Sequence, residues 1–250
     1  MADSARRRPH HSVRNVIRPA TSHVPIDASV AVFTFVGAWL VAQIISTVVL
    51  AILGNGEPAS DTPFGVLAVA LVAGWSAYLA GMWVASDQAG SGHPVDDYGI
   101  TFAPIDVLGL GIGVLSQLVL VKVVYLPLEQ IWPDTFTDDR LQENAKELID
   151  RAGGAATVLL FVIVALGAPV VEELFYRGLL QRSLAARFND GLVVVSVAFV
   201  FALVHFRVIE YPGLFAFGLV LGVTAIRTDR LGMPILTHIG FNVAGLLLAW

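Results

Sequence analysis

Six residues whose side chains could do chemistry lie in the last third of the sequence, inside stretches that are otherwise apolar. They are Glu172, Glu173, Arg177, His205, His238 and Asn242. An ionisable residue within an apolar span is costly, by at least ~2.5 kcal/mol on insertion scales, so it usually has a partner or a function. These six residues are therefore the candidate site.

The spacing of these residues indicates which of them act together. Glu173 and Arg177 are four residues apart, so on a helix they share a face and can form an ion pair. We expect this pair to be structural. Glu172 points about 100° away from Glu173 at 3.6 residues per turn, and it has no local partner, so we expect it to be functional. His238 and Asn242, also four apart, project together.

Water activation is the chemistry that this set of side chains supports. A carboxylate beside an imidazole can take a proton from water and direct the resulting hydroxide at a carbonyl carbon. Glu172 and His205 are the candidates for this role. The second face, with His238 and Asn242, could supply hydrogen-bond donors for the oxyanion that develops, or it could simply hold helices together.

A divalent metal is the alternative. Glu172, His205 and His238 could hold zinc, since one carboxylate and two imidazoles form a known catalytic ligand set. The sequence lacks the helical zinc motif with two histidines, so its local spacing does not single out a metal. The chain contains no cysteine, which excludes thiolate ligands, thiol nucleophiles and disulfides.

Composition places these residues in a membrane protein. Of 250 residues, 56% are hydrophobic and only 14% are charged, whereas soluble domains are about 25% charged. A span needs roughly 20 mostly apolar residues. The sequence predicts an all-α bundle of about seven spans, at 26–53, 64–86, 104–126, 154–188, 192–206, 214–226 and 233–250. A short amphipathic helix is expected at 141–149, lying at the membrane interface.

Basic residues indicate the orientation. Five of the arginines fall in the first 18 residues. With the N-terminus inside, nine Arg or Lys residues lie on the cytoplasmic side and four on the other side, which fits the positive-inside rule. We expect a basic cytoplasmic tail at 1–25 and one transmembrane domain at 26–250. The excess of arginine over lysine, 13 to 2, points to a GC-rich bacterium, and we expect the protein in its plasma membrane.

Chain lengths predict which of the candidate residues meet. Glu172 lies 17 residues before the turn at Asn189, and His205 lies 16 residues after it. In a helical hairpin these nearly equal arms bring Glu172 and His205 to the same level. The depth of His238 does not follow as cleanly. It meets the other two only if the fourth helix projects well past the membrane or if the loop at 228–232 dips into it.

The motifs Glu172-Glu173-x-x-x-Arg177, Phe201-x-x-x-His205 and His238-x-x-x-Asn242, in this order on successive apolar helices, resemble those of the CAAX-protease and bacteriocin-processing (Abi) family of intramembrane proteases. The resemblance covers residues 154–250, the expected catalytic core. It implies that Glu172 and His205 activate water, that His238 and Asn242 line an oxyanion site, and that Glu173 and Arg177 brace the site.

The function predicted on this basis is hydrolysis of a peptide bond in a membrane-associated protein or peptide, which could be prenylated. Two other classes stay open. Chains of Glu and His also mark proton paths in transporters, and a non-catalytic immunity or scaffold protein could keep the same cavity. The expected partners are the lipid bilayer and the substrate, with no nucleic acid.

Overall fold

The computed structural model describes residues 26–55 and 62–250, and within these ranges the chain is helical, without β-strands. The basic tail predicted at 1–25 lies outside the described residues. Six helical segments are long and apolar enough to cross a membrane, namely Ala28–Leu53 (α1), Phe64–Ala89 (α2), Pro104–Ile131, Ala156–Ala185, Val208–Thr228 and Gly232–Ala249 (α12). The predicted polytopic helical bundle is thereby confirmed.

The helix expected as the fifth of seven spans, at 192–206, ends three residues earlier than predicted. It is Asp190–Leu203 (α10), which has 14 residues and is roughly 21 Å long. Asn189 caps its N-terminus by accepting from the backbone N–H groups of Gly191 and Leu192. The chain leaves the helix after Leu203, and Phe206 adopts a positive φ of 53°. His205 therefore lies in a turn and not on a helix.

The outer surface of the bundle is apolar, as expected for helices that face lipid. Phe33 is 78% exposed, Ile44 63%, Val158 68% and Leu247 62%. The interior, in contrast, contains two charged side chains, those of Glu173 and Arg177. Six apolar helices with this distribution define an integral membrane protein.

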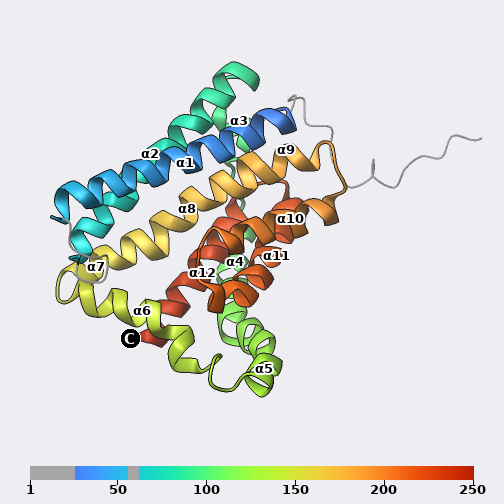
Figure 1. Cartoon of the computed structure of the whole chain (residues 1–250). Helices are drawn as coiled ribbons and strands as arrows, with labels where there is room; N and C mark the ends of the chain where they lie inside the picture. Colours follow the sequence, from blue (N-terminus) through green and yellow to red (C-terminus); the bar gives the residue numbers. More distant parts are fainter. Residues whose placement is uncertain (1–25, 56–61) are drawn as a thin grey trace, which may run out of the picture.

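The fourth span is the centre of the bundle (Figure 1). It joins five helical pieces, α7 (Ala156–Leu160), η4 (Phe161–Gly167), α8 (Ala168–Glu173), η5 (Leu174–Gln181) and α9 (Arg182–Ala185). The hairpin of α1 and α2 runs along one side of it, and α10 and α12 pack on the other. Both η4 and η5 are π-helical, and such turns are frequent at functional sites.

Close packing against the third span fixes the position of α12. The third span begins with η2 (Pro104–Val107) and α4 (Leu108–Leu115), and α4 contains three glycines. A Cβ on Gly109 would lie 2.6 Å from Met233 O, and one on Gly113 would overlap Thr237 O. Glycine at positions 109 and 113 thus allows the close packing of α4 against α12. A Cβ on Gly111 would meet nothing within 4 Å.

Polar contacts hold the start of α12 at the end of the bundle where η2 lies. Arg230 forms a two-pronged ion pair with the fully buried carboxylate of Asp106, with Nη2 2.7 Å from Oδ1 and Nε 2.9 Å from Oδ2. This hydrogen bonding raises the pKa of Arg230. The backbone N–H of Leu231 donates to Gly99 O and that of Gly232 to Thr101 O. The loop before α12 is thus tied to residues more than 100 positions earlier.

The remaining helices connect these elements. They are α3 (Pro94–Tyr98), η3 (Ser116–Leu120) and α5 (Val121–Ile131) in and before the third span, α6 (Asp138–Ala152), and η6 (Val208–Glu210) with α11 (Tyr211–Thr228) before α12. The amphipathic helix predicted at 141–149 is present as α6. Thr137 caps α6 by accepting from the backbone N–H of Arg140.

Candidate active site

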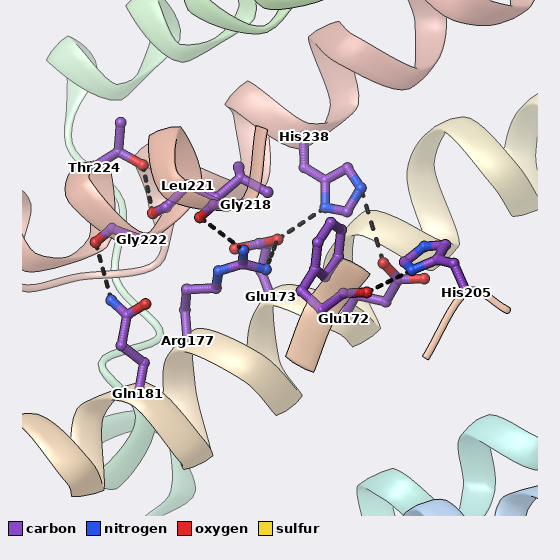
Figure 2. A network of polar contacts seen from close by, with 11 residues as sticks. Glu172, Glu173, Arg177, Gln181, His205, Gly218, Leu221, Gly222, Thr224 and His238 are labelled. Carbon is purple, nitrogen blue, oxygen red and sulfur yellow. Dashed lines mark hydrogen bonds and ion pairs between the residues drawn. The ribbon is translucent and has the colours of Figure 1, made fainter. Parts of the chain in front are cut away.

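A ladder of polar side chains runs along one buried face of the fourth span. Glu173, Arg177 and Gln181 follow one another at intervals of four residues, and all three are buried (Figure 2). Arg177 Nη1 lies 3.0 Å from Glu173 Oε1, and both side chains of this ion pair are fully buried. The predicted ion pair is therefore present.

The ladder also binds the neighbouring helix α11. Arg177 Nη2 donates to the carbonyl of Gly218 at 3.3 Å, and Gln181 Nε2 donates to that of Gly222 at 3.0 Å. Glycine at position 222 lets α11 approach the fourth span, because a Cβ there would lie 2.9 Å from Gln181 Oε1. The Arg177 guanidinium lies 4.7 Å from the centre of the Phe201 ring, which adds a cation–π contact.

His238 connects α12 to both glutamates. Its Nδ1 lies 2.8 Å from Glu173 Oε1, and its Nε2 lies 3.9 Å from Glu172 Oε2 (Figure 2). The rings of Phe201 and Phe217 contact the imidazole edge to face, at centroid distances of 5.8 and 5.4 Å. The sequence did not fix the depth of His238, and the structure places it beside the glutamates.

Hydrogen bonding indicates where the proton of His238 lies. A carboxylate oxygen can only accept, so a neutral His238 carries its proton on Nδ1, facing Glu173. Its Nε2 then presents a lone pair toward Glu172. His238 can act as a donor on that side only when the ring is doubly protonated.

His205 is held by a different acceptor. Its Nδ1 lies 2.7 Å from the backbone carbonyl of Phe201, one turn earlier in the chain. Because a carbonyl oxygen also only accepts, Nδ1 carries the proton and Nε2 is left with a lone pair. His205 can therefore serve as a base through Nε2.

Glu172 and His205 line the same cavity. It has a volume of about 340 Å³, and its walls come mainly from α1 and α2, with Glu172 and Tyr176 from the fourth span and Val204 and His205 from the turn after α10. The Glu172 side chain is 23% exposed, unlike the fully buried Glu173 beside it. The two neighbouring carboxylates thus differ in environment, as the 100° between them predicts.

Asn242 lies one turn beyond His238 on α12. Its Nδ2 donates to the backbone carbonyl of Val164 at 2.8 Å, which ties α12 to the fourth span. Neither Asn242 nor His238 is among the residues that line the 340 Å³ cavity. The predicted oxyanion role of these two residues stays a prediction.

The role of Glu172, His205 and His238 as ligands of a metal ion stays a prediction. In the described part of the chain, no group of three or more His, Asp or Glu side chains is arranged to hold one. The Nδ1 atoms of His238 and His205 are engaged by Glu173 and by a backbone carbonyl, so each ring keeps its Nε2 lone pair.

The first helical hairpin also lines the cavity, which the sequence did not predict. Gln43 and Ser46 from α1, and Trp75 and Tyr78 from α2, line the cavity with Glu172 and His205. One signal was available, since Gln43 places a polar amide near the middle of an apolar helix of 26 residues.

These features together define an integral membrane protein in which a carboxylate, Glu172, and an imidazole, His205, lie on the wall of one cavity. One family model matches the part of the chain that carries these residues. Residues 154–244 are similar to the family model described as type II CAAX prenyl endopeptidase Rce1-like. The match includes all six candidate residues, from Glu172 to Asn242. No curated protein and no solved structure matches the chain.

Proposed function

We propose that this chain is an intramembrane endopeptidase in which Glu172 and His205 activate a water molecule. The observation that carries the proposal is that both side chains line one cavity, each with an acceptor atom available to water. A base within hydrogen-bond reach of water is what general-base hydrolysis requires. The Rce1-like segment supports the same reaction class, because the matched family is one of endopeptidases.

In the proposed reaction, the water oxygen attacks the carbonyl carbon of the scissile bond while Glu172 accepts a water proton. The C–N bond then breaks, and the proton passes to the leaving amine. His205 Nε2 accepts a hydrogen bond from the same water and orients it. Glu173, held by Arg177 and His238, keeps the fourth span and α12 in register and does not touch the substrate.

The substrate class follows from the setting of the site. The cavity lies among apolar helices, so the substrate must reach it from the membrane or from its surface. The name of the matched family makes a prenylated protein with a C-terminal CAAX sequence the first substrate to test. Other membrane-associated proteins and peptides are the alternative substrates. We also propose a bacterial plasma membrane, with the N-terminus in the cytoplasm.

Peptide termini in cells test the proposal. Membrane and secreted termini are compared by mass spectrometry between cells that carry the wild type, Glu172→Gln or Glu143→Gln, at matched expression. Glu143 is the control, because it is exposed on α6. New termini with the wild type and Glu143→Gln, and none with Glu172→Gln, would support the proposal and identify the substrate.

Two outcomes would contradict the proposal. If cells with a folded, membrane-inserted Glu172→Gln variant contain the same new termini as cells with the wild type, Glu172 is not the base. No new termini with any folded variant would favour a scaffold or transport function.

A further inference from the structure

Two buried atoms of the polar ladder have no hydrogen-bond partner among the described residues. They are Nε of Arg177 and Oε1 of Gln181, which lie one helical turn apart on the same face of the fourth span. Both residues are only 2% exposed. A buried polar group without a partner loses its hydration and gains nothing in return, so such groups are usually bonded to protein or to ordered water. The donor of Arg177 and the acceptor of Gln181 therefore need a ligand that can both accept and donate.

The other polar atoms of these two side chains are already engaged. Gln181 Nε2 donates to the backbone carbonyl of Gly222 at 3.0 Å. A carbonyl oxygen only accepts, so the NH2 group must face Gly222, and Oε1 is left as the acceptor. Nη1 of Arg177 binds Glu173, and Nη2 donates to the carbonyl of Gly218. Neither side chain can turn toward a new partner without losing a hydrogen bond that it already makes.

A small cavity lies beside both side chains. It has a volume of about 20 Å³, and Arg177 and Gln181 line it together with residues of α3, α9, α11 and the loop before α12. A space of about 10–15 Å³ is enough for one water molecule, provided that polar partners are present. The cavity therefore has room for a single ligand of the size of water.

The charges around the cavity decide between water and a halide ion. Three arginines line the cavity, and each of them forms an ion pair with a carboxylate. The pairs are Arg177 with Glu173, Arg182 with Asp229, and Arg230 with Asp106. The positive charges are thus neutralised locally, and the acceptor oxygen of Gln181 would repel an anion. A water molecule is neutral and can donate to that oxygen.

We propose that one ordered water molecule binds in this cavity, where it accepts a hydrogen bond from Arg177 Nε and donates one to Gln181 Oε1. The water completes the hydrogen bonding of these two side chains and ties them together along the fourth span. Because the same guanidinium binds Glu173, the water also restrains the carboxylate that holds His238. The site shares no lining residue with the larger cavity, so the inference goes beyond the proposed function and does not depend on it.

A crystal structure of the full chain, at a resolution that shows ordered waters, tests the inference directly. We expect one density peak about 2.7–3.2 Å from Arg177 Nε and about 2.5–3.0 Å from Gln181 Oε1. The lack of such a peak, or a direct hydrogen bond between these two atoms, would overturn the inference. A second crystal, soaked in bromide, distinguishes water from a halide. An anomalous bromide signal at the peak would overturn the assignment to water.

Ala225→Val tests whether the water stabilises the protein. Ala225 lines the cavity from α11, and valine adds two methyl groups to this wall, which should displace the water. Arg177 Nε and Gln181 Oε1 then stay buried without a partner. We therefore expect the density peak to be lost and the melting temperature of the purified protein to fall by about 5 °C.

Ala216→Val is the matched control, because Ala216 is half-buried on the same helix and does not line the cavity. It reports the effect of valine in α11 without loss of the water, so the difference between the two melting temperatures measures the contribution of the water. If Ala225→Val lacks the peak and melts together with Ala216→Val, the water does not stabilise the ladder. If Ala225→Val does not fold, the structure of the wild type decides alone.

Discussion

Glu173 uses one carboxylate oxygen, Oε1, to bind His238 on another helix. The Oε1 to Nδ1 distance is 2.8 Å, and Arg177 Nη1 lies 3.0 Å from the same oxygen. The other oxygen, Oε2, is buried, and it has no hydrogen-bond partner among the described residues. The guanidinium of Arg177 and the imidazole of His238, which belong to two different spans, therefore bind the same oxygen of Glu173. This contact sets the position of His238 relative to Glu172, because Glu172 directly precedes Glu173 in the chain.

Arg177→Ala should destabilise the protein strongly, because it leaves the carboxylate of Glu173 buried with His238 as its remaining partner. Removal of one member of a buried ion pair costs about 3–5 kcal/mol. The loss should appear as a lower melting temperature of the purified protein in detergent. A melting temperature equal to that of the wild type would contradict the buried ion pair.

Arg151→Ala is the matched control for that experiment. Arg151 and Glu147 have the same spacing of four residues, but the side chain of Glu147 is 51% exposed and that of Arg151 is 23% exposed. An ion pair at the surface contributes about 0–1 kcal/mol. The melting temperature of this variant should stay close to that of the wild type.

His205→Ala should abolish most of the cleavage activity and leave the fold intact. Loss of a general base or of the group that orients the water typically costs about 10²–10⁴-fold in rate. The fold should survive, because His205 lies in a turn and makes its hydrogen bond to its own local backbone. His93→Ala is the control, since His93 is exposed. The measurement is the rate at which new termini appear in membranes, and an unchanged rate would remove His205 from the site.

Local spacing predicted those parts of the site that depend on a single helix or hairpin. An interval of four residues was enough to predict the ion pair of Glu173 and Arg177. The nearly equal arms around Asn189 predicted that Glu172 and His205 share a level, and both line one cavity. The predicted end of the fifth span, at residue 206, was wrong. The helix α10 ends at Leu203, and the chain then turns.

Contacts between residues distant in sequence were not predictable in the same way. The depth of His238 depends on the loop before α12, which is held by Asp106, Gly99 and Thr101. Tyr78 and Gln43 belong to a hairpin that places no Asp, Glu, Lys, Arg or His in the cavity wall, so no charged residue pointed to it in the sequence. Periodicity and composition locate helices in a membrane, but they do not say which faces meet.

Arg230→Ala should weaken the attachment of α12 to η2 and lower both stability and cleavage. The variant removes the two-pronged contact from the fully buried Asp106, and hydrogen bonds to charged groups are worth about 1.5–3 kcal/mol. Because the loop positions α12, His238 should lose its register with Glu173. Lys146→Ala is the control, because its partner Asp139 is 92% exposed. Equal melting temperatures for the two variants would show that Asp106 does not anchor the loop.

Gly113→Ala should separate α4 from α12 and thereby disturb the site from a distance. A Cβ at this position would overlap the backbone carbonyl of Thr237, the residue before His238, and backbone atoms cannot move aside as a flexible side chain does. Overpacking of this kind costs about 1–3 kcal/mol. We expect a lower melting temperature and a slower appearance of peptide termini in the same variant.

Gly111→Ala offers a control with the same chemical change two residues earlier. A Cβ on Gly111 would meet nothing within 4 Å, and alanine favours a helix over glycine by about 1 kcal/mol. This variant should be as stable as the wild type or slightly more stable, with unchanged cleavage. If the two variants behave alike, the contact between α4 and α12 does not position His238. If only Gly113→Ala loses activity, the glycine of the third span acts on the reaction through the backbone of α12.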